Sequence, residues 1–240
     1  FLLCLLGLLC WRTGYAQKDT LQLYHDLEVR SQQHRFSNIF FKQIFRGQDT
    51  LDLPLPIQKL SRQDFEQYRG RPIRHIRIDV ENPFGYDITD TLMHATDDLE
   101  VLGNSLHTRT QTKAIRNFLL FEEGDALDPY RITETVRILR SSGIFRNAII
   151  VPEHDTGDSL DLYVRIVDKW SITGKFVGTS SYRSLRLEER NFLGMDHDFI
   201  NTVQARPIFE PKGYTGSYEI NRIGHSFINA KVIYGDDLFD

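Results

Sequence analysis

A helix followed at once by a strand is predicted by residues 128–151, which read DPYRITETVRILRSSGIFRNAIIV. Asp128 suits the N-cap of the helix, and Pro129 suits its first turn, where the missing N–H leaves no helical hydrogen bond unmade. Up to Gly143, apolar side chains recur at helical spacing and form an inner stripe: Ile132, Val136 and Leu139. Gly143 ends the helix, and residues 144–151 form the strand.

The neighbouring stretches extend this pair into a unit that spans residues 71–168. Upstream, apolar residues alternate with charged ones as in a half-buried strand: Ile76, Ile78 and Val80. A further helix begins with a capping box at Thr108 and Gln111, ends at Gly124 and has three apolar residues to bury: Ile115, Phe118 and Leu119. Downstream, the alternation returns in a last strand: Leu160, Leu162, Val164 and Ile166.

The predicted order is therefore strand, helix, helix, strand, strand (β-α-α-β-β), which defines a small α+β domain. Three strands cannot bury both faces of a sheet by themselves, so we expect the two helices to cover one face. The stretch 82–107 between the first strand and the first helix is polar and contains Pro83, Gly85 and Gly103. We expect it to be a loop.

Residues 169–240 lose the helical period and predict only antiparallel β strands. Five stretches of about ten residues are separated by Gly, Pro, Asp and Ser, at 170–180, 185–193, 198–206, 214–222 and 226–234. One side of the fourth is formed by Tyr214, Gly216, Tyr218 and Ile220, and one side of the fifth by Ile228, Ala230, Val232 and Tyr234. A transmembrane β-barrel has such strands, apolar toward lipid and polar toward the lumen, and a soluble β-sandwich has the same alternation. Because five strands cannot close a membrane barrel, the barrel interpretation makes the sequence an amino-terminal fragment.

Residues 1–16 are typical of a secretory signal peptide. The opening apolar run, 1–11, is shorter than the roughly 20 residues of a membrane-spanning helix, and we expect cleavage after Ala16. Both cysteines, Cys4 and Cys10, lie in that run, so the mature chain would hold together without disulfides. A lipid anchor and a retained helix are the alternatives.

Residues 17–70 predict a helical prelude to the α+β unit. Its aromatic cluster indicates a face packed on neighbouring elements, with a membrane-surface face as the alternative: Phe36, Phe40, Phe41 and Phe45. The whole chain of 240 residues has 40% hydrophobic and 26% charged residues and a net charge of -4. Without a basic excess, nucleic acid is not an expected partner.

The stretch 71–168 resembles a POTRA domain, the polypeptide-transport-associated module. The matching stretches are IRIDV (76–80), FEEGDALD (121–128), ILRSSGIF (138–145) and LDLYVRIV (160–167). The stretch after it resembles the start of the barrel in BamA/TamA-type outer-membrane proteins, the bacterial surface antigen superfamily, through ERNFLG at 189–194. The helical prelude with a single POTRA-like unit is similar to barrel proteins of Bacteroidetes-type bacteria.

This resemblance implies a protein of the Gram-negative outer membrane, with the POTRA domain in the periplasm and a truncated transmembrane β-barrel in the lipid. Its implied partners are unfolded outer-membrane or exported polypeptides, outer-membrane lipid and accessory assembly proteins. Its implied function is insertion or transport of polypeptides. The alternatives are a dedicated secretion pore or anchor, and a soluble periplasmic scaffold.

Client binding by strand addition is expected at the edge strand of the POTRA-like unit, on the face formed by Phe145, Asn147, Ile149 and Val151. The alternative is that the helices and the prelude cover both faces of this strand. Trp170, at the junction with the barrel strands, is a candidate for the membrane interface, with an ordinary junction contact as the alternative. Two polar clusters are more typical of a solvated loop and a turn than of a metal site: His94, Asp97, Asp98 and Glu100, and Asp196, His197 and Asp198. Without catalytic or phosphate-binding motifs, neither an enzyme nor a cofactor is expected.

Overall fold

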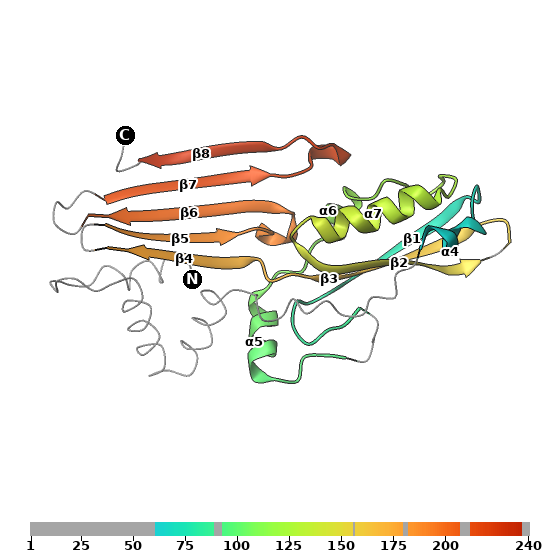
Figure 1. The fold of residues 1–240 in the computed structure, drawn as a ribbon, viewed down its shortest axis with the longest axis horizontal. Coiled ribbons are helices and arrows are strands. Elements are labelled where there is room, and N and C mark those ends of the chain that lie inside the picture. Colours follow the sequence, from blue (N-terminus) through green and yellow to red (C-terminus); the bar gives the residue numbers. More distant parts are fainter. Residues whose placement is uncertain (1–60, 89–92, 156, 180–181, 207–211, 237–240) are drawn as a thin grey trace.

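The computed structural model contains two β-sheets that follow one another along the long axis of the molecule, with the helices gathered around the first (Figure 1). The structure describes residues 61–88, 93–155, 157–179, 182–206 and 212–236. The predicted signal peptide and most of the predicted helical prelude lie outside these ranges, and so do Phe36, Phe40, Phe41 and Phe45.

The first sheet has three strands in the order β1-β3-β2, with β1 parallel and β2 antiparallel to β3. The elements of this unit are α4 (Arg62–Glu66), β1 (Ile73–Glu81), α5 (Asp98–Leu106), α6 (Thr112–Arg116), α7 (Pro129–Ser141), β2 (Phe145–Asp155) and β3 (Leu160–Asp168). The predicted order is present as β1, α6, α7, β2 and β3. Among the described residues, no helix combines the length and the apolar character needed to cross a membrane.

Helices α6 and α7 lie on one face of this sheet, and the core is between them and the strands (Figure 1). Ile132 and Leu139 of α7 are completely buried, as is Ile115 of α6. Opposite them are the alternating residues of β3, also with no exposed surface: Leu160, Leu162, Val164 and Ile166. The predicted apolar stripes are therefore confirmed.

The N-terminus of α7 follows from its sequence. Asp128 adopts an extended conformation and its side chain accepts a hydrogen bond from the backbone N–H of Tyr130 at 3.0 Å, while Pro129 occupies the first turn. The helix ends before Gly143, whose φ of 83° is a left-handed conformation that glycine adopts without strain.

Three predictions about the stretch 82–124 are wrong. The helix begins at Thr112 with Gln111 as its N-cap, so Thr108 caps nothing. It ends at Arg116 and not at Gly124, so Phe118 and Leu119 are buried after its end. The stretch 82–107 is not only a loop, because it contains α5. That helix is held by tertiary contacts: the Asn104 side chain bonds both backbone groups of Phe84, at 3.2 and 2.9 Å, and a Cβ on Gly103 would lie 2.8 Å from the Phe84 ring.

The second sheet is antiparallel throughout, in the order β4-β5-β6-β7-β8. Its elements are β4 (Ile172–Gly178), β5 (Arg183–Glu189), η1 (Phe192–Gly194), β6 (His197–Ala205), β7 (Lys212–Ile220), η2 (Ile223–His225) and β8 (Ala230–Asp236). All five predicted strands are present, with ends displaced by one to four residues. The short helix η1 occupies residues 192 and 193, which the alternation had assigned to a strand, whereas η2 lies between the fourth and fifth predicted strands.

Replacing Leu139 with Ala tests the core between α7 and the sheet. The side chain is fully buried, so we expect the loss of its contacts and the cavity left behind to lower the free energy of unfolding by about 2–5 kcal/mol. Urea unfolding of the protein in detergent measures the change. Tyr130→Ala, at a position on α7 where 57% of the residue is exposed, is the control and should change stability by less than about 0.5 kcal/mol.

Candidate functional site

Strand β2 is an edge of the three-stranded sheet, since only β3 pairs with it among the described strands. A β-bulge between Phe145 and Asn147 shifts the register. Phe145 is therefore part of the core, where its ring lies 5.4 Å from that of Phe118. The prediction that Phe145 shares a face with Asn147, Ile149 and Val151 is wrong for Phe145 alone, because the extra residue of a bulge reverses the alternation.

The other face of β2 and β3 is partly covered by the segment 82–88, which turns back over the sheet. The Arg165 guanidinium donates to the carbonyl oxygen of Ile88 at 3.0 Å, and the Arg146 guanidinium donates to that of Tyr86. Near this cover, Asn147 is only 6% exposed. The part of β2 that remains for a partner is thus its backbone edge more than its side-chain face.

Trp170 lies between the two sheets and is only 4% exposed. Its ring centroid is 5.6 Å from that of Phe84 and 6.4 Å from that of His107. A side chain so enclosed by protein does not reach lipid headgroups. The structure thus places Trp170 in a contact within the junction between the two sheets. This is the alternative considered from the sequence, and the assignment to the membrane interface is wrong.

A buried carboxylate organises this junction. Asp168, the last residue of β3, has no exposed side-chain surface, and neither does His107. One carboxylate oxygen of Asp168 is 2.9 Å from Nε2 of His107 and accepts from the backbone N–H of Thr110 at 2.8 Å, and the other accepts from the Thr110 hydroxyl at 2.7 Å. These contacts compensate the loss of water around the carboxylate.

The turn between β5 and β6 docks onto the same segment. The Asn191 side chain donates to the Thr110 hydroxyl at 2.7 Å, and the Gln111 side chain donates to the carbonyl oxygen of Leu193 at 2.9 Å. The backbone N–H of Gln111 also donates to the carbonyl oxygen of Gly194 at 2.8 Å. Gly194 has a φ of 70°, and a Cβ there would lie 2.3 Å from the carbonyl oxygen of Arg109. Only glycine fits this close approach.

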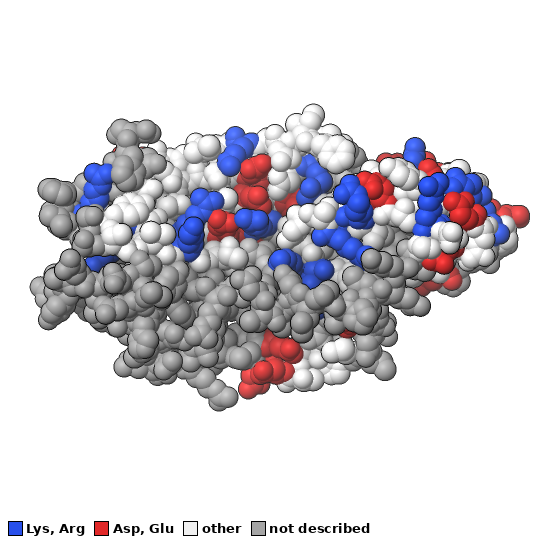
Figure 2. Space-filling view, viewed as in Figure 1, with Lys and Arg blue, Asp and Glu red and all other residues white. Residues whose placement is uncertain are grey.

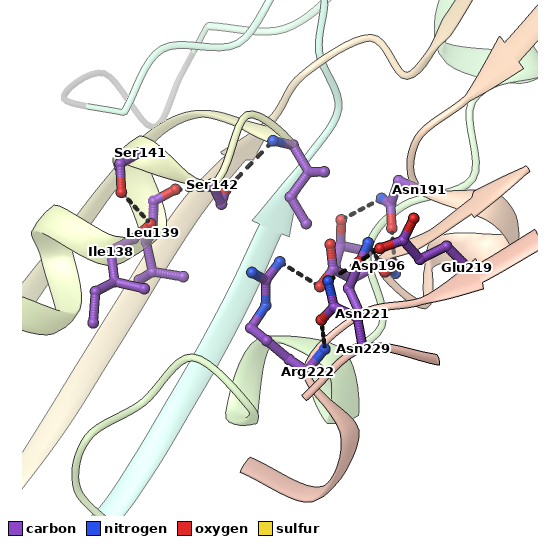
Figure 3. Close-up of polar contacts among 12 residues, drawn as sticks. Ile138, Leu139, Ser141, Ser142, Asn191, Asp196, Glu219, Asn221, Arg222 and Asn229 are labelled. Carbon is purple, nitrogen blue, oxygen red and sulfur yellow. Dashed lines mark hydrogen bonds and ion pairs between the residues drawn. The ribbon is translucent and has the colours of Figure 1, made fainter. Parts of the chain in front are cut away.

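A charged pair connects this turn to the end of β7 (Figure 3). The guanidinium of Arg222 forms an ion pair with the carboxylate of Asp196, and its Cζ lies 3.8 Å from the centre of the Phe118 ring. Asn221 donates to the backbone carbonyl of Asp196 at 3.0 Å, and Asn191 accepts from its N–H at 2.8 Å. Burial raises the pKa of the Asp196 carboxyl to about 6, against the opposing effect of Arg222.

The two polar clusters that the sequence presents as metal-site alternatives lie in different surroundings. Asp196 pairs with Arg222, and Nδ1 of the adjacent His197 lies 2.6 Å from the Tyr218 hydroxyl. The other cluster lies at the N-terminal end of α5, where acidic side chains gather on the surface (Figure 2). Among the described residues, no group of three or more His, Cys, Asp and Glu side chains is placed to hold a metal ion.

The second sheet has one apolar face. Cross-strand register places Tyr218 of β7 opposite Phe199 of β6 and Val232 of β8, which confirms the faces predicted for the last two strands. The Tyr234 ring fills the space above Gly216, where a Cβ would lie 2.3 Å from its Cζ. The same face also contains Ile172, Phe176, Leu185, Leu187, Val203, Tyr214 and Ile220.

The opposite face of this sheet is polar. It includes Thr202, Thr215, Ser217 and Glu219. Lys231 of β8 forms an ion pair with Glu219 at 3.4 Å, and Arg186 with Glu188 at 2.5 Å on β5. In Figure 2, positive and negative side chains are interspersed near the junction. The two faces of the sheet thus differ in overall polarity. The polar face also contains Val177, Ile200 and Ile233, and the apolar face His197 and Asn201.

The junction residues were not identified from the sequence. His107 is only the last residue of a polar stretch, and Thr110 and Asp168 follow no spacing rule. The available signal was the stretch ERNFLG, which contains Asn191 and Gly194. Its resemblance to a barrel-entry motif indicated its importance but not the partner on which it docks.

Comparison with protein-family models and with curated proteins finds no match. Among solved structures, the chain is similar to BamA from Haemophilus ducreyi lacking POTRA domains 1–3, with 13% identity and a TM-score of 0.44 over 68% of this chain. It is also similar to CdiB from Acinetobacter baumannii, with 10% identity and a TM-score of 0.36 over 62% of this chain. The chain spans 27% and 26% of the lengths of those two chains. Likeness at this level establishes neither a family nor a function.

Replacing Gly194 with Ala tests the docking of the turn. A Cβ there collides with the backbone of Arg109, so we expect the turn to leave the junction and lose its hydrogen bonds to Gln111. At about 0.5–1.5 kcal/mol for each bond, the free energy of unfolding should fall by about 2 kcal/mol more than in the control, which shares only the backbone strain. The control is Gly224→Ala, which has a φ of 58° and no atom within 4 Å of the added Cβ. Equal effects on urea unfolding would show that backbone strain alone, without docking, accounts for both.

Asp196→Asn tests the buried carboxyl through pH. Because its pKa is about 6 in the folded protein and 3.8 as the ordinary value, the folded state binds the proton at higher pH than the unfolded chain does. The wild type should therefore lose stability relative to the variant as pH rises from 4 to above 6, by at most about 3 kcal/mol. Asn tolerates the φ of 60° at this position. A difference in unfolding free energy that stays constant with pH would contradict this expectation.

Proposed function

We propose that this chain is the amino-terminal part of a BamA/TamA-type outer-membrane β-barrel protein. In this proposal, residues 71–168 are a periplasmic POTRA domain that receives unfolded polypeptides. Residues 169–240 supply the first strands of a barrel that inserts those polypeptides into the outer membrane or transports them across it.

The observation that carries the proposal is the polarity of the five-stranded sheet. Its strands contain seven to nine residues each, and their register gathers apolar side chains on one face and polar ones on the other. A strand that crosses a bilayer needs about 9–11 residues, apolar toward lipid and polar toward the lumen. Strands β6 and β7 reach the lower end of this range, and β4, β5 and β8 are two residues shorter. The apolar face suits contact with hydrocarbon, and the paired charges suit a wet interior.

The first unit supports the assignment of a POTRA domain through its element order and its edge. The order β1, α6, α7, β2, β3 is that expected for the module, and its β2 edge is adjacent to no other described strand. Strand addition at such an edge binds extended chains mainly through main-chain hydrogen bonds, which demand little of the client's sequence. Ile149 and Val151 remain the proposed client-contacting side chains, because Phe145 belongs to the core and the Asn147 side chain is buried.

The apolar face can be tested with single nitroxide labels in the full-length gene product, reconstituted in lipid vesicles, after its cysteines, Cys4 and Cys10 among them, are replaced by Ser. At Val203 of the apolar face, we expect high collision rates with oxygen and low rates with a water-soluble nickel complex, because lipid concentrates oxygen. Thr202, its neighbour on the polar face, should show the reverse in a water-filled lumen. Low rates with both reagents at Val203 would indicate a sandwich core and would overturn the barrel.

The function itself is tested in cells with the full-length gene product and its signal. We expect a heat-modifiable protein in isolated outer membranes, and depletion should lower the amounts of many other outer-membrane barrels. Loss of a single exported protein would favour the dedicated secretion pore, and no loss would favour an anchor. Absence from the outer membrane would overturn the proposal.

A further inference from the structure

The start of β2 determines which of its residues direct their backbone N–H and C=O groups toward β3 and which direct them away from it. The N–H of Lys169 donates to the carbonyl oxygen of Ile144 at 2.8 Å, which joins the two strands just before the bulge. Because the bulge adds one residue, the backbone groups of Ala148, Ile150 and Pro152 point away from β3, toward the open edge of the sheet. Pro152 fits this assignment, since proline has no N–H to give to the ladder.

Both outward groups of Ala148 are already bonded to side chains of the same unit. Its N–H donates to Oδ1 of Asn147 at 2.9 Å, and its carbonyl oxygen accepts from Nε of Arg140 at 3.0 Å. Arg140 comes from the last turn of α7, the helix that packs against β2. Asn147 is buried, so its amide is held in place. A strand added to β2 needs these two groups.

The opposite edge of the sheet has the same arrangement. At Ile76 of β1, the N–H donates to Oε1 of Glu123 at 3.0 Å and the carbonyl oxygen accepts from the Arg116 guanidinium at 3.5 Å. At each edge, an arginine from a covering helix donates a hydrogen bond to the outward carbonyl oxygen. The outward N–H donates to an amide or carboxylate oxygen of a side chain. Exposed sheet edges pair readily with other chains, and such side chains are a means of preventing it.

We propose that Arg140 and Asn147 form a latch that closes the β2 edge at Ala148, so that an extended polypeptide adds to this edge only by displacing both side chains. This inference rests on the proposed function, because it concerns the regulation of the same client-binding edge. The latch restricts strand addition to segments that bind the β2 edge more strongly than the side chains of Arg140 and Asn147 do. It also keeps the empty edge from pairing with another copy of the domain.

The test measures binding of a labelled peptide with the sequence of β7, KGYTGSYEI, as a model barrel strand, to the protein in detergent micelles. The variants are Arg140→Met, Asn147→Val and the double variant. Removing the competing hydrogen bonds should lower the Kd, by about tenfold in the double variant and by less in each single one. Arg140→Lys retains a donor and should bind as the wild type does.

The matched control is Arg137→Met, on the exposed side of α7, where Arg137 pairs with Glu134; its Kd should not change. Far-ultraviolet circular dichroism verifies the fold of each variant. A disulfide between Val151→Cys and a cysteine-bearing peptide locates the bound strand in a protein whose Cys4 and Cys10 are replaced by Ser. Equal affinities for all variants, with the cross-link formed, would overturn the latch and leave the client edge intact. No cross-link in any variant would overturn the latch together with client binding at β2.

Discussion

Asp168 ends β3 with a carboxylate withdrawn from water, and the joint between the two sheets is built around it. A buried charge without partners destabilises a protein by several kcal/mol, so the chain must bring donors to it. Thr110 supplies two donors, its backbone N–H and its hydroxyl, one to each carboxylate oxygen. Nε2 of His107 lies beside the oxygen that the N–H bonds. Thr110 then accepts from Asn191 in the turn after β5, so one carboxylate positions the segment before α6 and the start of β6 together.

Around this cluster, the two sheets are joined by polar and aromatic contacts more than by a shared apolar core. Gly194 lies against the backbone of Arg109, and Arg222 reaches from the end of β7 to the Phe118 ring while it pairs with Asp196. Hydrogen bonds and ion pairs depend on direction, so these contacts define how the five-stranded sheet is oriented on the first unit.

At both edges of the first sheet, side chains of the same unit bond the outward backbone groups of one residue. Arg140 at β2 and Arg116 at β1 both come from the helical layer, so the elements that cover the core also protect the edges. The segment 82–88 adds a partial cover over the remaining face. Such side chains keep an exposed sheet edge from pairing with other chains.

The sequence by itself determined α7, β3 and the faces of β7 and β8, because caps and alternation act between residues a few positions apart. It also indicated β2 as a strand. Tertiary structure alone decided the bulge that moves Phe145 into the core, the helix α5 held by Phe84, and the burial of Trp170. It also decided the junction, where His107, Thr110 and Asn191 meet partners 61, 58 and 81 residues away. No local pattern encodes such contacts, since they form only when the folded chain excludes water from a polar group and another segment replaces it.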